Sequence, residues 1–289
     1  MKANKKELYK HVDYLTGIEP ARNYRNMDSL NRSADYIYSE LGEYGCRTEE
    51  QTFKVDGNIY RNIIGSVGPK DAPRIIVGAH YDVAGDQPGA DDNASAVAGL
   101  LETAWLIAPL DQQLKKRIDF VAYSLEEPPF FGSSSMGSAV HADSLRENEI
   151  NVEFMVCYEM IGYFSDEPGS QKFPSMMPEM SGIDVGNFII VVGIERYREL
   201  AGKIASLMRQ NTDLRVESLN FPSPHGMVGL SDHSCYWRNG YPAVMLTDTS
   251  FLRNPNYHQE TDTIDTLDFN RMASVITGMS GALRDVATR

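Results

Sequence analysis

Histidine and carboxylate residues recur in this chain beside short apolar runs. They are His80 and Asp82 after 74–79, Asp91 and Asp92 before 93–108, Glu126 and Glu127 after 118–123, Glu159 after 154–158, and His258 after 242–246. If the runs are strands of an open α/β sheet, ligands bind beyond their carboxyl ends, so these side chains reach one edge. Carboxylates crowded there repel one another unless cations lie among them, and imidazoles with carboxylates suit zinc.

Each of these residues also has an ordinary structural role. An acid at a strand end is usually a turn residue, and Asp91 or Asp92 could simply cap a helix. A lone histidine is more often a satisfied core or surface residue than a ligand, and the pair Glu126-Glu127 alone would be two solvated charges. Their joint placement is what indicates a metal centre.

The elements that must position these residues alternate along the chain. Strands are expected at 74–79, 118–123, 154–158, 188–192 and 242–246, and helices at 93–108, 134–148, 195–209 and 269–287. This alternation predicts an α/β fold, in which a central, mostly parallel mixed sheet is covered by helices on both faces in three α/β/α layers.

The flanking segments complete a single expected domain. Residues 6–45 have apolar residues at helical spacing, and residues 51–65 alternate as an edge hairpin does. Residues 163–185 are rich in Pro, Gly, Ser and Met, which predicts a long loop at the rim of the active site. We expect one domain over residues 1–289, with the N-terminal helical segment 1–50 packed on it.

Composition narrows the classes of partner and location. The formal charge is 27 − 40 = −13, which disfavours nucleic acid and anionic membranes as partners. No apolar run has the length that spans a bilayer. The N-terminus is positively charged but has no apolar stretch behind it, which predicts a cytoplasmic protein. A chain that began after a removed leader, and was secreted or periplasmic, would look the same. Composition leaves the oligomeric state open.

Cysteine usage argues against a disulfide framework or a cysteine-rich zinc knuckle. The chain has three cysteines, Cys46, Cys157 and Cys235, and no CxxC spacing among them. We expect each to be a buried free thiol.

Six short motifs follow one another along the chain: Gly78–Asp82, Gly89–Ser95, Ser124–Glu127, Tyr158–Gly162, Ser231–His233 and Tyr257–Thr263. Together they resemble the M28 family of zinc aminopeptidases, in the zinc-dependent exopeptidase superfamily. Each motif alone is only moderately specific, but their order and spacing match the family from about residue 60 to residue 270. The resemblance implies a phosphorylase/hydrolase-like fold and two Zn²⁺ ions, with other divalent metals open.

The resemblance also implies a ligand for each ion. His80 and Glu159 would bind one zinc, Glu127 and His258 would bind the other, and Asp92 would bridge both. Aligning the motif on Ser95 favours Asp92 over Asp91 as the bridge, although the doublet leaves both open. Family members commonly have Asp where this chain has Glu159, which keeps the carboxylate and adds a methylene.

Catalytic roles follow from the same resemblance. Asp82 would accept a hydrogen bond from the free ring nitrogen of His80, and Glu126 would be the general base. A bend at the strand end would let Glu127 face the metal and Glu126 face solvent. Tyr257 could donate a hydrogen bond to the developing oxyanion, or could be a packed loop aromatic.

Three further residues are candidates for a supporting role. Asp91, Asp232 and His233 would orient the ligands or contact substrate, and for Asp232-His233 a structural hydrogen bond between loops is an equal alternative. The segments 163–185 and 221–230 could shape a side-chain pocket. Four apolar residues could line it, although core packing is the more usual role for each: Phe130, Phe131, Met160 and Trp237.

The implied activity is hydrolysis of N-terminal residues from peptides with a free N-terminus. The alternative on the same fold is a glutaminyl-peptide cyclotransferase, which works with one zinc and attacks with the substrate's own amine. The full set of five ligands favours hydrolysis. A carboxypeptidase or amidohydrolase of similar chemistry stays open, and a non-catalytic binding protein is disfavoured by the presence of both Glu126 and the ligands.

Overall fold

The computed structural model describes residues 1–174, 177, 180 and 182–289. An eight-stranded sheet runs through these described residues, in the strand order β1-β2-β4-β3-β5-β8-β6-β7. Its strands are β1 (Arg47–Val55), β2 (Asn58–Val67), β3 (Arg74–His80), β4 (Arg117–Tyr123), β5 (Val152–Glu159), β6 (Phe188–Ile194), β7 (Arg215–Phe221) and β8 (Ala243–Thr247). The predicted hairpin is β1-β2, with β1 at the edge of the sheet.

The middle of the sheet is parallel. β4, β3, β5 and β8 are neighbours and run in the same direction, whereas β2 lies antiparallel to β4. β6 lies antiparallel to β8 and parallel to β7. The carboxyl ends of the four central strands therefore meet at one edge of the sheet, which is the arrangement predicted for the candidate site.

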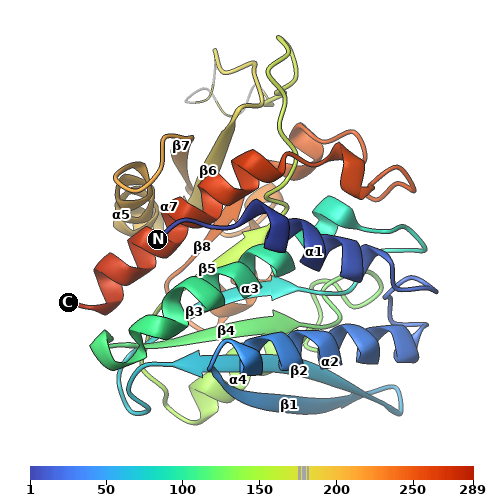
Figure 1. Cartoon of the computed structure of the whole chain (residues 1–289), viewed down its shortest axis with the longest axis vertical. Helices are drawn as coiled ribbons and strands as arrows, with labels where there is room; N and C mark the ends of the chain where they lie inside the picture. Colours follow the sequence, from blue (N-terminus) through green and yellow to red (C-terminus); the bar gives the residue numbers. More distant parts are fainter. Residues whose placement is uncertain (175–176, 178–179, 181) are drawn as a thin grey trace.

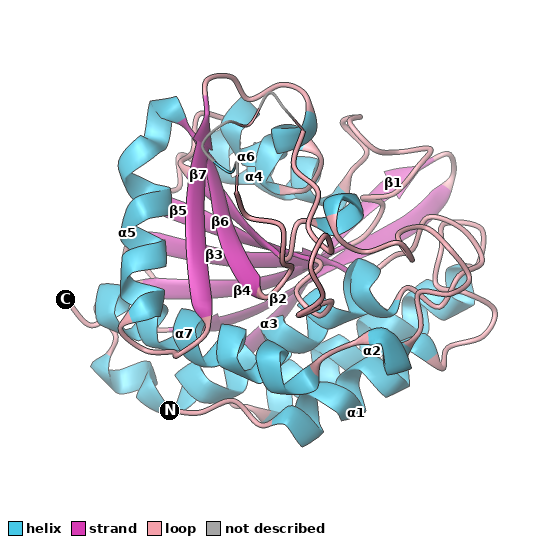
Figure 2. Ribbon diagram, turned by 90° about the horizontal axis from the view of Figure 1, so that it is seen from above, coloured by secondary structure: helices cyan, strands magenta, loops and turns pink. Residues whose placement is uncertain are grey.

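Helices cover both faces of the sheet (Figures 1 and 2). In the described residues they are α1 (Lys5–Thr16), α2 (Met27–Glu43), α3 (Ala96–Ile107), α4 (Gly137–Glu147), α5 (Arg198–Arg209), α6 (His233–Arg238) and α7 (Phe269–Ala287). One face carries α1, α2, α3, α5 and α7, and the other carries α4 and α6. The three-layer α/β/α prediction is confirmed.

Apolar sequence explains where the core lies. In β3, Ile75, Ile76 and Val77 are all fully buried, because both faces of a central parallel strand are covered. Their side chains alternate between the two cores: Ile75 and Val77 pack with α3 and α7, and Ile76 packs with α4 and α6. Helix α3 is buried at every residue except Trp105.

Two elements were not predicted. β7 mixes polar and apolar residues and is an edge strand with much of its surface exposed, so its sequence lacks a strong strand signal. α6 has only six residues, too few to show helical periodicity. The predicted loop 163–185 contains no α-helix or strand in its described part, and residues 175–176, 178–179 and 181 of it lie outside the described residues.

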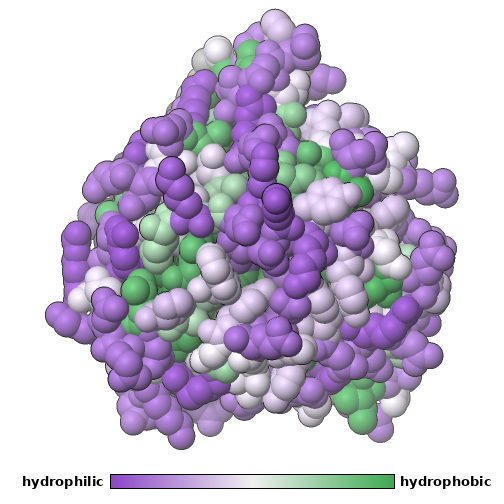
Figure 3. Space-filling model, in the orientation of Figure 1, coloured by the Kyte–Doolittle hydropathy of each residue, from purple (hydrophilic) through white to green (hydrophobic). Residues whose placement is uncertain are grey.

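The molecular surface is largely hydrophilic on the face that carries α1, α2 and α7, with hydrophobic residues in scattered patches (Figure 3). None of the helices in the described part of the chain combines the length and apolar character that crossing a bilayer requires. Cys46, Cys157 and Cys235 are buried free thiols, as predicted.

Candidate metal centre

The four central strands bring the predicted residues to one edge of the sheet. β3 ends at His80 and β5 ends at Glu159, while Glu126 and Glu127 follow β4. Asp92 lies in the short helical turn Ala90–Ser95 that leads into α3. These side chains are at least 90% buried, so their charges lie in a medium that screens them poorly.

Asp92 lies between two histidines, one for each of its carboxylate oxygens. Its Oδ1 is 3.5 Å from His80 Nε2, and its Oδ2 is 3.1 Å from His258 Nε2. Glu159 Oε2 lies 3.5 Å from His80 Nε2, and Glu127 Oε2 lies 3.4 Å from His258 Nε2. Two histidine–carboxylate pairs therefore share one central carboxylate, and Asp92 rather than Asp91 occupies that position.

The chemistry of these donors fits divalent zinc. One carboxylate, one imidazole and a shared carboxylate on each side are ligands that Zn²⁺ accepts. Donor atoms of His80, Asp92 and Glu127 lie within 4.8 Å of one another, as do those of His80, Glu126 and Glu159. Glu127 Oε1 is buried and has no hydrogen-bond partner among the described residues, which is the expected state of an oxygen that coordinates a cation.

Glu126 is also close to the His80 side of the centre. Its Oε2 lies 3.8 Å from His80 Nε2, compared with 3.5 Å for Glu159. Distance alone therefore does not distinguish a general base from a ligand at this position.

The excess of negative charge shifts the titration of the site. Burial lowers the pKa of His258, but hydrogen bonds to Asp92 and Glu127 outweigh that effect and raise it to about 10. Burial raises the pKa of Glu127 to about 7, and the neighbouring charge of Asp92 contributes to the rise. A cluster that holds protons this strongly has a strong affinity for cations.

The bend after β4 has a local backbone cause. Leu125 has φ 61°, in the left-handed region that L-residues rarely adopt, and it directly precedes Glu126 and Glu127. The expectation that Glu126 faces solvent was wrong, because it is 5% exposed and Glu127 is 4% exposed. Both carboxylates line the same pocket, and burial raises the pKa of Glu126.

Asp82 contacts the site differently from the expectation. His80 Nδ1 lies 3.2 Å from the backbone carbonyl of Asp82 and 3.6 Å from its carboxylate Oδ1, so the ring hydrogen bond goes to the carbonyl. The carboxylate instead accepts hydrogen bonds from the amides of Glu126 and Glu127, each at 3.1 Å. Asp82 thereby fixes the backbone that carries both glutamates.

The remaining candidates lie behind the donors. Asp91 accepts hydrogen bonds from Gly162 N (2.9 Å) and Asn254 Nδ2 (2.7 Å), which link three loops. Asp232 is fully buried, its carboxylate oxygens have no hydrogen-bond partner among the described residues, and burial raises its pKa to about 7. The His233 ring bonds the carbonyl of Val228 at 2.6 Å, which is the structural alternative.

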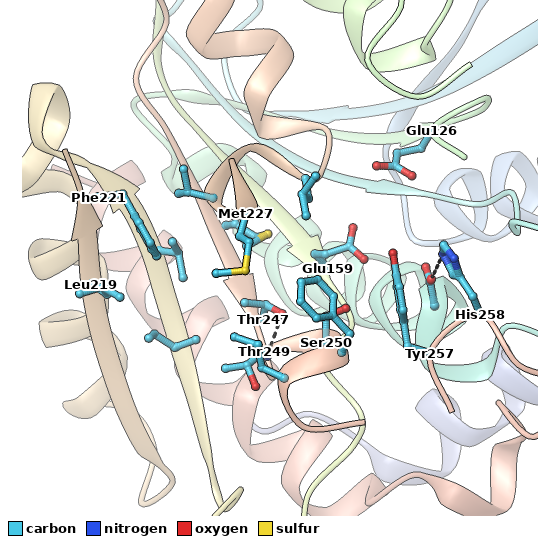
Figure 4. Close-up of a pocket in the computed structure, with 18 of the residues that line it drawn as sticks. Glu126, Glu159, Leu219, Phe221, Met227, Thr247, Thr249, Ser250, Tyr257 and His258 are labelled. Carbon is cyan, nitrogen blue, oxygen red and sulfur yellow. Dashed lines mark hydrogen bonds and ion pairs between the residues drawn. The ribbon is translucent and has the colours of Figure 1, made fainter. Parts of the chain in front are cut away.

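A mostly apolar pocket adjoins the metal centre, with a volume of about 190 Å³. In Figure 4, Glu126, Glu159, Tyr257 and His258 lie on one side, and Leu219, Phe221 and Met227 lie on the other. The segments 163–185 and 221–230 both contribute walls, as predicted. Of the apolar residues that the sequence suggested, Phe131 lines the pocket, whereas Phe130, Met160 and Trp237 do not.

Tyr257 lies beside the metal centre and faces the pocket. Its ring stacks on that of His258 with centroids 3.8 Å apart and planes inclined by 20°. Burial and the carboxylates Asp92 and Glu127 raise its pKa, so the phenol stays protonated and can donate a hydrogen bond.

A model of peptidase family M28 matches residues 62–282 of the chain. The chain belongs to this family. The match includes every proposed ligand, and begins after α1, α2 and β1.

Sequence relatives span most of this M28 peptidase. It is 45% identical over 288 residues to the uncharacterized protein YfbL of Escherichia coli, with 96% of this chain and 87% of the relative covered. It is 26% identical over 278 residues to a probable leucine aminopeptidase of Trichophyton verrucosum, with 91% of this chain and 65% of the relative covered.

Solved structures share its fold at lower identity. The LapA aminopeptidase of Legionella pneumophila has a TM-score of 0.79 at 22% identity, covering 99% of this chain and 73% of that one. BSAP, a zinc aminopeptidase from Bacillus subtilis, has a TM-score of 0.77 at 14% identity over 98% and 95%. A glutaminyl cyclase of Bacteroides thetaiotaomicron has a TM-score of 0.68 at 20% identity, covering 98% of both chains.

Two residues that bind the backbone beside the candidate metal ligands were not identified from the sequence. Asp262 accepts hydrogen bonds from the amides of Asp91 and Asp92. Asn93 bonds the carbonyl of Tyr158 (3.2 Å) and the amide of Met160 (3.0 Å), which flank Glu159. Both residues are polar and lie inside the quoted motifs, which is the feature by which the sequence could have identified them. Their hydrogen bonds go to backbone groups, and such partners can be identified only from the folded structure.

Proposed function

We propose that this M28 peptidase is an aminopeptidase that removes N-terminal residues from peptides with the help of two zinc ions. The observation that carries the proposal is the position of Asp92, whose two carboxylate oxygens face His80 and His258 at 3.5 and 3.1 Å. A single carboxylate shared between two histidine–carboxylate pairs suits a two-metal hydrolase.

The contacts support one set of ligands. His80 and Glu159 would hold one ion, Glu127 and His258 would hold the other, and Asp92 would be shared by both. When bound, the ions lower the pKa of a shared water and polarise the scissile carbonyl. Ser231 donates a hydrogen bond of 2.6 Å to Glu159 Oε2 and so fixes the longer side chain that replaces the family's usual Asp.

Glu126 is the proposed general base. Its raised pKa, caused mainly by burial, suits a carboxylate that takes a proton from the attacking water and returns it to the leaving amine. Tyr257 donates a hydrogen bond to the oxygen that becomes negative as the carbonyl is attacked. Asp82 keeps the Glu126 carboxylate in place through the backbone amide.

The pocket supports a preference for a large apolar N-terminal side chain. Its far wall is built from Leu219, Phe221 and Met227, and Met245 lies in the same pocket. The charged side chains that line it, Asp92, Glu126, Glu127, Glu159 and His258, all belong to the metal centre. The packing of α1 against α3 and of α2 against β2 supports a single domain over residues 1–289.

The second candidate is a glutaminyl-peptide cyclotransferase, since structures of glutaminyl cyclases share the fold. That reaction uses the amine of the substrate as nucleophile and needs only one zinc. The presence of donors for a second ion, His258 and Glu127, supports hydrolysis.

A panel of aminoacyl nitroanilides, matched N-acetylated controls and a glutaminyl peptide tests the proposal. We expect hydrolysis of free-amine substrates, no hydrolysis of the acetylated ones, loss of activity with a chelator and recovery with zinc. Zinc analysis should give two ions per chain. One zinc per chain with pyroglutamate formation would instead establish the cyclotransferase, and hydrolysis of acetylated substrates would establish a different peptidase or amidase.

A further inference from the structure

Arg22 is a buried cation outside the segment that the family model matches. It lies between α1 and α2, is 2% exposed, and forms no ion pair with a carboxylate in the described part of the chain. Its guanidinium instead donates to backbone carbonyls of Tyr81 (3.0 Å), Gly89 (2.6 Å), Leu15 (3.3 Å) and Pro88. Burying a charge costs free energy unless its hydrogen-bond donors are satisfied, and here backbone carbonyls satisfy them.

Three of the four carbonyls that Arg22 contacts, those of Tyr81, Pro88 and Gly89, lie at the two ends of one loop. Tyr81 directly follows His80, and Gly89 lies three residues before Asp92. The backbone carbonyl of Arg22 also accepts a hydrogen bond from Val83 N at 3.2 Å, inside the same loop. One arginine therefore joins the start and the end of the connection between two proposed metal ligands.

Gly89 permits this contact. It has φ 62°, and a Cβ atom there would lie 2.3 Å from Val83 Cγ1, 2.4 Å from the Asp92 carbonyl and 3.1 Å from Arg22 Nη2. Only glycine can bring its carbonyl this close to the guanidinium. The Gly89 of the family-like motif and Arg22 from the N-terminal segment thus form one contact.

The shape of arginine matters at this position. Its planar guanidinium directs several donors into a fixed fork, whereas lysine offers a point charge on a flexible stem. Burial lowers the pKa of Arg22 to about 10, and the carboxylates Asp262, Asp92 and Asp82 partly offset the decrease. The side chain therefore stays charged at neutral pH.

We infer that Arg22 is a positioning residue, which holds the two ends of loop 81–89 so that His80 and Asp92 meet the same metal ion. The metal ion in this inference is the one assumed in the proposed function, and to that extent the inference rests on it. It assigns a task in building the site to the N-terminal segment, which lies outside the matched residues 62–282.

The test compares Arg22→Lys and Arg22→Met with Arg117→Lys. Arg117 is a second buried arginine, paired with Asp119 (2.6 Å) at the start of β4, away from the edge where the strands end. For each variant, zinc affinity is measured by competition with a chromophoric chelator, kcat and KM are measured separately, and the thermal midpoint of the metal-free protein is recorded. Hydrogen exchange of residues 81–92 is followed in the metal-free protein.

Both Arg22 variants should bind zinc at least 10-fold more weakly, with a lower kcat, a KM within 3-fold of wild type, and faster exchange in residues 81–92. A displacement of about 1 Å in such a site costs about 100-fold in rate. Arg117→Lys should lower the thermal midpoint and leave zinc affinity unchanged.

Three outcomes would overturn the inference. If Arg22→Lys kept wild-type zinc affinity, charge rather than the guanidinium fork would be responsible. If the Arg22 variants lost only thermal stability, Arg22 would be an ordinary core residue. The exchange measurement needs no metal, so unchanged exchange in residues 81–92 counts against the positioning role even if wild-type protein binds no zinc and the proposed function fails.

Discussion

Asp262 accepts hydrogen bonds from the backbone amides of Asp91 and Asp92, at 2.9 and 3.0 Å, one with each carboxylate oxygen. Asp82 binds the amides of Glu126 and Glu127 in the same way. Asp82 and Asp262 are not proposed ligands, but they fix the backbone of Asp92, Glu126 and Glu127, which are two proposed ligands and the proposed base. In both pairs, the carboxylate and the amides that it binds come from segments far apart in the sequence.

Replacing Asp262 should weaken the metal centre without removing a ligand. Asp262→Ala loses both hydrogen bonds, each of which contributes about 1–2 kcal/mol, because burial raises the pKa of Asp262 to about 7 and leaves this acceptor only partly charged at neutral pH. We expect a decrease of about 2–4 kcal/mol in the free energy of unfolding, measured by urea titration of the metal-free protein, together with weaker zinc binding. Asp262→Asn keeps one good acceptor and should lie between Asp262→Ala and wild type. Wild-type zinc affinity in Asp262→Ala would refute this role.

Glu126→Gln distinguishes a base from a ligand. If Glu126 moves the proton, kcat should fall by about 10²–10⁴-fold while the protein still binds two zinc ions. The matched variant Glu127→Gln changes the adjacent residue, which faces His258 Nε2 at 3.4 Å, and should lower the zinc content. Loss of a zinc ion from Glu126→Gln would assign that side chain to the metal instead.

His141 should make stability depend on pH. Burial lowers its pKa from 6.5 to about 4, and its Nδ1 lies 2.6 Å from the Tyr236 hydroxyl. Since the folded state disfavours the proton, the stabilisation is complete above pH 6.5 and is lost as the pH falls towards 4.

The measurement is urea unfolding of chelated protein at pH 7 and pH 5. Between pH 7 and pH 5, the free energy of unfolding of wild type should decrease by about 2 kcal/mol more than that of His141→Gln. The reason is that His141 takes up a proton in the unfolded chain and not in the folded chain. His225→Gln, at an exposed histidine, is the control and should behave as wild type. Equal losses in wild type and His141→Gln would contradict the prediction.

Met227 should influence which N-terminal residue is accepted. Burial of a leucine side chain contributes about 1.5–3 kcal/mol, so a charge in this wall should lower kcat/KM for leucyl nitroanilide by at least 10-fold. Met227→Glu should raise the rate for the lysyl substrate. Ile59→Glu, which adds the same charge at a residue 61% exposed on β2, is the control. If Met227→Glu had the same ratio of leucyl to lysyl kcat/KM as wild type, the substrate side chain would not contact this wall.

The sequence was most informative where apolar runs were long and continuous. β3, β4, β5, β6 and β8 and helices α3, α4, α5 and α7 all lie close to their predicted positions. β7 was missed because an edge strand does not need a continuous apolar pattern, and its residues 217–221 are only partly buried.

Residues that act on side chains were easier to predict than residues that act on the backbone. The structure brings the five predicted ligands together as expected: His80, Asp92, Glu127, Glu159 and His258. They could be identified from the sequence because histidine and carboxylate side chains are common zinc ligands. Asp262, Asn93 and Arg22 bind amides and carbonyls, which every residue possesses, so nothing in the sequence identifies their partners.

The unit β6–α5–β7 runs against the direction of the four central strands, and it supplies Ile190, Val192, Leu219 and Phe221 to the pocket. The proposed ligands and base all come from other parts of the chain. Under the proposed function, one part of the pocket wall is therefore encoded in a stretch of sequence that contains none of the proposed ligands. Substitutions between residues 188 and 221 are then expected to change which side chains the proposed pocket accepts without replacing a proposed ligand or the proposed base.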